Sequence, residues 1–261
     1  MASPTLTVMT NAARKAARSL QRDFGEVENL QVSLKGPANF VTRADRRAEQ
    51  ILHDELAKAR PAYGFVMEEA GEIAGRDGEH RWIIDPVDGT TNFIHGIPHF
   101  AISIALEKLG TILAGLIYNP ISNDLFTAER GRGAYLNDRR LRVAARRELA
   151  DAVLACGMPH RGRGDPAQFQ GELARLQPRV AGLRRFGSAA LDLAWVAAGR
   201  YDGYWERGLA SWDVAAGVLL VREAGGRAED FDGGDPVVSG DVLAANDDLF
   251  QALRKELRKD A

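Results

Sequence analysis

The sequence has little of what marks a disulfide-stabilised, membrane-spanning or nucleic-acid-binding protein. Its 261 residues include one cysteine, Cys156, which excludes an intrachain disulfide. No run of 18 apolar residues occurs, so no membrane-spanning helix is expected. Charged residues make up 27% and the formal net charge is −2, a balance that argues against a dedicated nucleic-acid binder. The N-terminus lacks the basic-then-apolar plan of a signal peptide, and we therefore expect a soluble cytoplasmic protein.

The hydrophobic content of 45% is enough for a full core in one large domain or two small ones. Apolar residues at helical spacing predict helices over 5–22, 43–56, 166–177, 187–198, 211–224 and 247–259. Short apolar or β-branched runs predict strands over 64–67, 81–84, 100–106, 112–118, 124–128, 152–157, 183–186, 203–206 and 242–245. Turn signals between residues 100 and 143, including Asn137-Asp138, predict an antiparallel sheet there. Cys156 lies in an apolar run and is expected to be a small core residue.

The stretch from residue 82 to residue 93 carries the strongest chemical signal. Its apolar start reads as a buried strand, which we expect to end at Asp85 because Pro86 has no amide proton for a central ladder. Gly89 allows a second turn three residues later. The result is a strand tip that carries two carboxylates, Asp85 and Asp88, followed at once by two threonine hydroxyls.

Two carboxylates held close at a buried strand end repel each other unless one is protonated or a cation lies between them. The carbonyl and hydroxyl oxygens around Asp85 and Asp88 are hard ligands, which suit Mg²⁺ rather than zinc. An Asp-Pro turn in which Asp88 caps a loop is the alternative. The number of oxygen donors in this one stretch favours the metal site.

Two further segments place acids at the ends of elements. Glu68 and Glu69 follow the predicted strand 64–67, and only one of them can face a shared site because adjacent residues of an extended chain point to opposite faces. A surface acidic loop is the alternative. Asp213 falls in the first turn of a helix that Ser211 could cap, where the helix dipole favours a negative charge.

Small residues at 187–190 open another helix, where free backbone amides suit an anion or substrate oxygens. A simple N-cap by Ser188 is the alternative. Glu206 is an acid at the end of a predicted strand. Thr42 and Asp45 have the spacing of a variant capping box, so helix capping is one explanation for both.

Five arginines between residues 139 and 147 indicate a solvated face or an oligomer contact, with a weak anionic or RNA contact as the alternative. His95 and His99 lie near the aspartate motif. They have no third ligand close in sequence, and we expect structural roles for both.

With these pieces placed, the chain resembles the inositol monophosphatase family of Mg²⁺-dependent, Li⁺-sensitive phosphatases over nearly its whole length, and most of all its bacterial inositol-1-monophosphatase branch. Two motifs carry the resemblance, DPVDGTTNF at 85–93 and WDVAAG at 212–217. The Glu68-Glu69 pair, residues 41–45 and residues 187–189 strengthen it.

The resemblance implies an α/β (α+β) fold, a layered αβαβα sandwich like that of fructose-1,6-bisphosphatase. It implies one domain, 1–261, with two sub-halves at roughly 1–145 and 146–261. A homodimer is the usual assembly of the family. Two or three Mg²⁺ ions are the implied cofactors, with inhibition by Li⁺.

The resemblance also implies roles for particular residues. A first metal is implied between Glu69, Asp85 and the backbone carbonyl of Val87. A second is implied between Asp85, Asp88 and Asp213, and Glu69 is also implied to help hold a third. Thr90 and Glu69 are implied to orient the nucleophilic water, and Lys35 and Asp45 to belong to a mobile lid loop. The implied substrate contacts are Asp88, Gly89, Thr90, Gly187, Ser188, Ala189, Glu206 and Asp213.

Two positions depart from the family pattern. Asn39 stands where the lid loop usually carries an acid, and we expect this change to weaken or retune the third metal. Ala70 stands where a hydroxyl residue usually follows the glutamate pair, which removes a local cap.

The expected function is Mg²⁺-dependent hydrolysis of a phosphate monoester by activated water, without a covalent intermediate. The first candidate substrate is myo-inositol 1-phosphate, so the expected partner is a small phosphorylated polyol. Related sugar, histidinol and 3′-nucleotide phosphates are alternatives, because the pocket walls and not the metal ligands select among them. A regulatory RNA- or transcription-associated protein that keeps the fold is an alternative of another class.

Overall fold

The computed structural model describes residues 3–26, 32–34, 40–159 and 164–258, without the side chains of 32–34 and 40–42. Asn39 and Lys35 lie outside the described residues, so their predicted parts in a lid loop are not addressed. None of the helices within the described residues is long and apolar enough to cross a bilayer.

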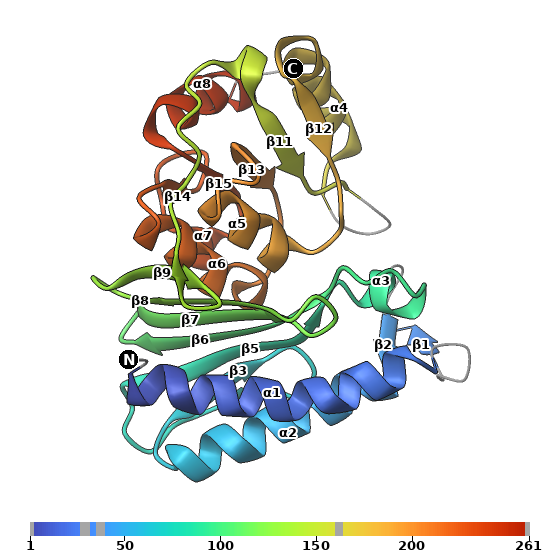
Figure 1. Ribbon diagram of the computed structural model, residues 1–261, viewed down its shortest axis with the longest axis vertical. Helices are drawn as coiled ribbons and strands as arrows, with labels where there is room; N and C mark the ends of the chain where they lie inside the picture. The colour runs from blue at the N-terminus through green and yellow to red at the C-terminus, as the bar shows by residue number, and fades with distance from the viewer. Residues whose placement is uncertain (1–2, 27–31, 35–39, 160–163, 259–261) are drawn as a thin grey trace.

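Five layers stack in the order helix, sheet, helix, sheet, helix, which confirms the αβαβα sandwich (Figure 1). The outer helices on one side are α1 (Pro4–Phe24) and α2 (Arg43–Ala59), and the middle helices are α5 (Ala189–Ala197) and α6 (Ser211–Glu223). The other outer helices are α4 (Pro166–Leu176) and α8 (Asp247–Leu257). Two short helices, α3 (Thr90–Ile94) and α7 (Pro236–Ser239), complete the α-helices within the described residues.

The larger sheet has eight strands in the order β10-β9-β8-β7-β6-β5-β3-β4. Their bounds are β3 Gly64–Met67, β4 Gly71–Ile73, β5 His80–Asp88, β6 Ala101–Lys108, β7 Thr111–Asn119, β8 Asp124–Glu129, β9 Gly133–Leu136 and β10 Arg139–Arg140. Strands β5 to β10 pair antiparallel, as the turn signals predicted, and Asn137 and Asp138 both have positive φ in the β9–β10 turn. Only β3 and β5 pair parallel in this sheet.

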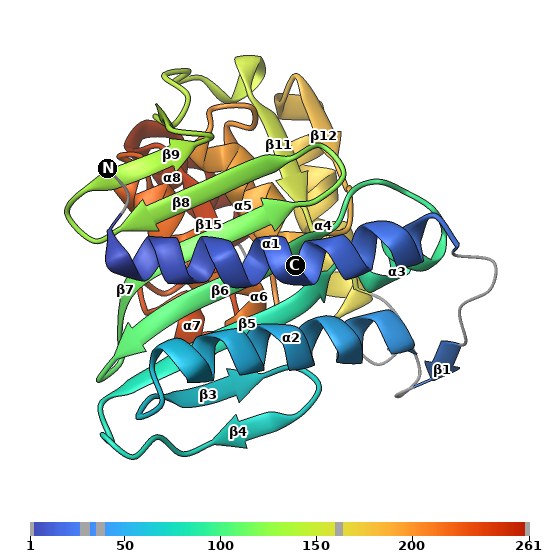
Figure 2. The same ribbon diagram turned by 60° about the horizontal axis from the view of Figure 1, so that its bottom comes forward.

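The smaller sheet has five strands in the order β12-β11-β13-β15-β14. Their bounds are β11 Val153–Cys156, β12 Gly182–Arg184, β13 Gly203–Glu206, β14 Arg227–Glu229 and β15 Val242–Ala245. A separate pair, β1 (Val32–Leu34) and β2 (Phe40–Thr42), lies at the end of α1 and α2 (Figures 1 and 2).

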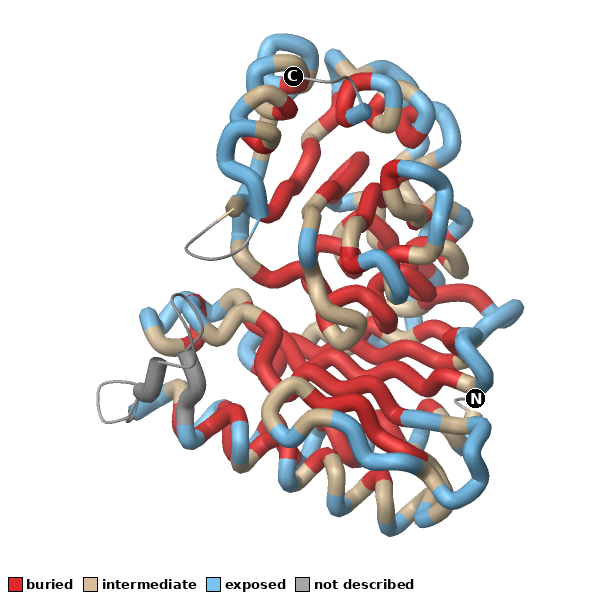
Figure 3. The backbone as a smooth tube through the Cα atoms, turned by 180° about the vertical axis from the view of Figure 1, so that it is seen from behind, coloured by how far each residue is buried: buried red, intermediate tan, exposed pale blue. Residues whose placement is uncertain are grey.

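Three hydrophobic cores separate these layers. One lies between the larger sheet and helices α1 and α2, where the predicted stripe of α1 is buried at Leu6, Met9, Ala13, Ala16, Ala17 and Leu20. The second joins the other face of that sheet to α5, α6 and the smaller sheet, and the third lies under α4 and α8. The central strands β3, β5, β6 and β7 of the larger sheet are consequently buried along most of their length (Figure 3). Cys156 is buried in the third core, as expected.

Strand β5 differs from the prediction, because it continues to Asp88 instead of ending at Asp85. The ladder between β5 and β6 shifts register between Asp85 and Asp88. Such a β-bulge leaves an extra residue unpaired, so Pro86 can lie within the strand without costing a ladder hydrogen bond.

Helix α6 packs directly on the larger sheet through a glycine. A Cβ atom at Gly115 of β7 would lie 2.9 Å from the Ala216 carbonyl oxygen and 3.0 Å from its Cα. No flexible side chain is available to move, because both atoms belong to the helix backbone. The absence of a side chain at Gly115 therefore sets how closely the N-terminal half of α6 approaches the strands.

We predict that Gly115→Ala lowers the free energy of unfolding by about 1–3 kcal/mol, the usual cost of overpacking a core. Urea denaturation of the purified protein measures this. The matched control is Gly25→Ala, where φ is −69° and the nearest atom to an added Cβ lies at an ordinary 3.5 Å. Equal stability losses in the two variants would contradict the close approach at Gly115.

Candidate metal centre

Three aspartates from distant parts of the chain meet between the larger sheet and α6. Carboxylate oxygens of Asp85, Asp88 and Asp213 all lie within 4.8 Å of one another. The three residues are only 2%, 9% and 9% exposed. Oxygen ligands at this spacing can surround one or more small divalent cations.

The bulge in β5 explains why Asp85 and Asp88 face the same way. Asp85 pairs with Ser103 and Asp88 with Ala101, so three steps along β5 match two steps along β6. Ser103 and Ala101 share a face because side chains alternate along a strand, and their partners therefore share it too. Without the extra residue, Asp88 would point toward α1 and α2.

Local hydrogen bonds hold this bent backbone. The Val87 amide donates to Asp85 Oδ1 at 2.8 Å, and Thr90 Oγ1 donates to the Val87 carbonyl at 3.0 Å. Gly89 follows with φ of +98°, in the left-handed region that favours glycine, and an added Cβ would lie 3.1 Å from the His99 carbonyl oxygen. The predicted turn at Gly89 is thus present, and it starts the short helix α3.

Asp88 also binds the start of helix α5. Its Oδ2 accepts hydrogen bonds from Ser188 Oγ at 2.5 Å and from the Ala190 amide at 2.7 Å. Ser188 is the N-cap of α5, as predicted, and its Oγ accepts from the Leu191 amide at 3.4 Å. The Asp88 carboxylate therefore belongs to the acidic cluster and also binds the 187–190 segment.

Asp213 is held by its own helix. Its Oδ2 accepts a hydrogen bond from the Ala210 amide at 2.8 Å, and Ala210 is the N-cap residue of α6. The prediction that Ser211 caps the helix is wrong, since Ser211 is already helical. Ser103 Oγ donates to the Trp212 carbonyl at 3.2 Å, which ties the start of α6 to the strand residue opposite Asp85.

Burial and mutual repulsion raise the pKa values of these acids. Burial is the largest cause for Asp85, followed by the charges of Glu68, Asp88 and Asp213, and the pKa lies well above its usual range. Burial and the charge of Asp213 raise the pKa of Asp88 to about 8, against hydrogen bonds from Ser188 and Ala190 that lower it. A divalent cation would relieve both the repulsion and the burial penalty. The all-oxygen donor set fits Mg²⁺.

The two glutamates after β3 separate to opposite faces of the sheet. Val66 and its partner Ile83 lie in the core toward α5 and α6, whereas Met67 and Ile84 lie in the core toward α1 and α2. The ladder extends one residue further, since the Glu68 amide donates to the Ile84 carbonyl at 3.3 Å. Alternation therefore puts Glu68 on the face of Asp85.

Glu69 takes the other face, away from the aspartates. Its Oε2 lies 3.7 Å from Arg46 Nε of helix α2, and its amide donates to the buried carboxylate of Glu49 at 2.8 Å. By contrast, the charge of Glu68 is one of the causes that raise the pKa of Asp85. The geometry thus runs against Glu69 as the shared ligand and points to Glu68, which sequence reasoning missed.

Glu206 and Asp45, two further residues implied by the resemblance, lie in different places. Glu206, at the end of β13, contributes to the raised pKa of Asp88, accepts a hydrogen bond from Tyr204 and packs against the backbone of Gly157. Asp45 does not lie in a lid loop but in the first turn of α2, where it is buried.

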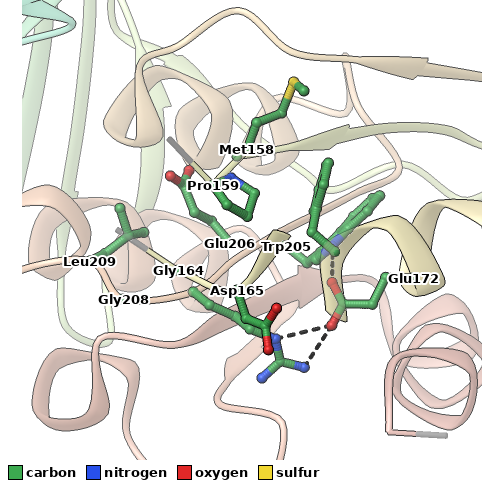
Figure 4. Close-up of a pocket in the computed structure, with 12 residues that line it drawn as sticks. Met158, Pro159, Gly164, Asp165, Glu172, Trp205, Glu206, Gly208 and Leu209 are labelled. Atoms are coloured by element: carbon green, nitrogen blue, oxygen red, sulfur yellow. Dashed lines mark hydrogen bonds and ion pairs between the residues drawn. The ribbon is translucent and has the colours of Figure 1, made fainter. Parts of the chain in front are cut away.

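A small pocket lies beside Glu206, between the ends of β11 and β13 (Figure 4). Met158, Pro159, Trp205 and Leu209 line it. Its volume of about 30 Å³ has room for a water molecule or two but not for a sugar ring.

His99 and Cys156 have no chemical role in this geometry. The His99 ring packs against Phe186 and Trp195, and burial lowers its pKa to about 4. Burial raises the pKa of the Cys156 thiol to about 12, so it is not a nucleophile at neutral pH.

Comparison with known proteins agrees with this architecture. Residues 1–260 match the model of the inositol monophosphatase family. The chain is 61% identical to an inositol-1-monophosphatase of Mesorhizobium japonicum over 258 residues, 98% of this chain and 97% of that protein. It is 43% identical to the Nus factor SuhB of Escherichia coli over 98% of this chain and 96% of that one.

A solved structure gives the same result. The crystal structure of extragenic suppressor protein suhB from Bartonella henselae superposes with a TM-score of 0.96 at 57% identity, covering 99% of this chain and 100% of that chain. The fold and the acidic cluster define a layered α/β phosphatase. The chain belongs to the inositol monophosphatase family, as the two motifs predicted.

The raised pKa values predict how stability depends on pH. Burial and repulsion raise the pKa of Asp88 to about 8 in the folded protein, whereas the ordinary pKa of an aspartate is 3.8. Folded protein therefore binds more protons than the unfolded chain between these values, and its stability without metal falls as the pH rises through that window. We expect the melting temperature in EDTA to drop by about 5 °C or more between pH 5.5 and pH 8.

Excess Mg²⁺ should reverse this trend, because the cation binds only the deprotonated carboxylates and stabilises the folded state. Differential scanning fluorimetry across this pH range, with EDTA or with Mg²⁺, measures both effects. Asp213→Asn is the control, since removing one charge should flatten the curve in EDTA. A melting temperature that rises with pH in EDTA would contradict the electrostatic account.

Proposed function

We propose that this phosphatase hydrolyses phosphate monoesters of small polyols, with myo-inositol 1-phosphate as the first candidate, and that it requires Mg²⁺. The observation that carries the proposal is the buried cluster of Asp85, Asp88 and Asp213, in which burial and mutual repulsion raise the pKa values of Asp85 and Asp88. Phosphate monoesters hydrolyse extremely slowly in water, so a catalyst must neutralise charge and position a nucleophile.

Asp85, Asp88 and Asp213, with Glu68 and the Val87 carbonyl, are the residues we propose to hold two or three Mg²⁺ ions. Bound Mg²⁺ supplies charge neutralisation and an activated nucleophilic water. Thr90, whose hydroxyl already contacts the Val87 carbonyl, would help to orient that water. Li⁺ inhibition is part of the same proposal.

We propose direct attack by water, without a phosphoenzyme, because two side chains that could act as nucleophiles, Cys156 and Ser188, are buried and bound to other groups. Cys156 is buried with a raised pKa. The Ser188 hydroxyl is only 1% exposed, and it donates to Asp88 while it caps α5. Neither side chain can reach a phosphate that lies over the acidic cluster without first leaving its partners.

The alcohol product would lie beside the 187–189 segment and Glu206. The charge of Glu206 helps to raise the pKa of Asp88, so Glu206 lies near that carboxylate, and the Ser188 hydroxyl donates to the same carboxylate. Acceptors and backbone donors of this kind suit the vicinal hydroxyls of a polyol. This arrangement supports a polyol phosphate over an apolar monoester.

The adjacent glutamates give a matched test of the metal site. We predict that Glu68→Gln lowers kcat/KM by about 100-fold or more and raises the Mg²⁺ concentration for half-maximal activity, because a ligand charge is lost. Glu69→Gln should stay within about threefold, since Glu69 faces Arg46 and Glu49. Steady-state kinetics under Mg²⁺ titration measures both, and the reverse ranking would assign the role to Glu69.

A substrate panel tests the proposed reaction itself. Phosphate release is measured with inositol 1-phosphate, fructose 1,6-bisphosphate, histidinol phosphate and a 3′-phosphonucleotide, with Mg²⁺ and with added Li⁺. We expect the highest kcat/KM for inositol 1-phosphate, inhibition by Li⁺ and no turnover by Asp85→Asn. Glu206→Ala should mainly change the ratios of kcat/KM among the four substrates, and it should lower the four values together to a smaller extent.

One relative of the chain is called a Nus factor, which gives the regulatory alternative its specific support. The arginines of 139–147 are mostly exposed, although Arg146 pairs with Asp202 at 2.9 Å and Arg147 with Asp248 at 3.1 Å. Lack of phosphate release from all four substrates, together with salt-sensitive RNA binding that Asp85→Asn retains, would favour that role over the phosphatase proposal.

A further inference from the structure

Asn92 joins the two parts of the site that the proposed reaction needs. It lies in α3, within the aspartate motif at 85–93, and is only 6% exposed. Its side-chain Nδ2 donates to the His99 carbonyl and to the Phe186 carbonyl, each at 2.7 Å. The Gly187 carbonyl lies at 3.5 Å from the same nitrogen. One amide thus connects the motif, the start of β6 and the loop before α5.

The backbones meet closely at this point. A Cβ atom at Gly89 would lie 3.1 Å from the His99 carbonyl oxygen and 3.3 Å from that of Gly187. Carbonyl oxygens that approach each other in a buried site need a donor between them, because an unpaired buried acceptor destabilises the folded state. Asn92 supplies that donor.

The 187–190 segment is consequently held at both ends by residues of the aspartate motif. Asn92 binds the carbonyls at 186 and 187, and Asp88 binds the Ser188 hydroxyl and the Ala190 amide. Gly187 lies between these anchors with φ of +81°, so the backbone turns there. Asp88 is also a proposed metal ligand, whereas Asn92 binds only protein groups in the contacts described.

We infer that Asn92 is a positioning residue that sets the substrate-binding segment 187–189 against the metal centre, and so determines preference for a polyol leaving group. This inference rests on the proposed function. Loss of the amide would free the carbonyl end of the segment while Asp88 still holds the other end. Contacts with substrate hydroxyls would then weaken, and the metal ligands would stay in place.

The test compares two phosphate monoesters that differ in hydroxyl groups. Inositol 1-phosphate needs the 187–189 segment, and p-nitrophenyl phosphate, which has no alcohol hydroxyls, does not. For Asn92→Ala we expect KM for inositol 1-phosphate to rise about tenfold, consistent with the loss of two buried hydrogen bonds. We expect kcat/KM for p-nitrophenyl phosphate to change by less than about threefold. The rise in melting temperature on adding Mg²⁺ should stay unchanged.

Asn246→Ala is the matched control. Asn246 Nδ2 also donates to two carbonyls, those of Ala144 at 2.8 Å and Arg146 at 2.7 Å, but it caps α8 on another layer. It should leave the ratio of the two kcat/KM values unchanged. Asn92→Ser, which keeps a donor, should give an intermediate KM, and it carries the test if Asn92→Ala does not fold.

Equal losses on both substrates, or a weaker stabilisation by Mg²⁺, would overturn the inference, because Asn92 would then support the fold or the metal centre in general. An unchanged ratio of the kcat/KM values for the two substrates would overturn it as well. Lack of activity of the unaltered protein on both substrates would instead be a failure of the proposed function.

Discussion

Repulsion among buried carboxylates is the constraint on which this structure depends. Asp85, Asp88 and Asp213 are brought within 4.8 Å of one another, in a place that water hardly reaches. Such a cluster is costly in the folded protein unless protons or cations neutralise it. Because of this cost, the protonated form of Asp88 is favoured and its pKa rises to about 8. A divalent ion would offer the same relief at neutral pH.

Two backbone features create the cluster. The bulge in β5 turns Asp88 to the face of Asp85, and the close approach of α6 at Gly115 brings Asp213 to that face. The helix layer between the sheets therefore completes the site. Asp88 and Asn92 extend this coupling to the start of α5, so the acids and the 187–190 segment form one connected unit. Changes in the packing of α5 or α6 should for this reason affect chemistry even without touching a ligand.

Much of this could be read from the sequence, because the signals were local. The apolar strands, the antiparallel block after residue 100 and the Ser188 cap follow from periodicity and turn residues over short windows. The layered fold was predicted from the resemblance that the two family motifs carry. Asp85, Asp88 and Asp213 were also predicted together, although their convergence depends on the packing of α6.

The errors concern features set by neighbouring strands. Whether Glu68 or Glu69 faces Asp85 depends on the parallel register of β3 against β5, which no local pattern records. The continuation of β5 past Pro86 depends on its pairing with β6. Ser211 looked like a cap, but the Asp213 carboxylate already accepts the Ala210 amide, so the helix starts one residue earlier than a Ser211 cap implies. Asn92 belongs to the 85–93 motif, but its positioning role could not be predicted, because its acceptors come from residues 99 and 186.

The most direct test of the central claim is anomalous diffraction from crystals of the protein grown with Mn²⁺ in place of Mg²⁺. The account predicts anomalous peaks among the carboxylates of Asp85, Asp88 and Asp213, with Glu68 next to them. Peaks only at other places, such as beside Glu49 and Glu69, or none at saturating Mn²⁺, would contradict it.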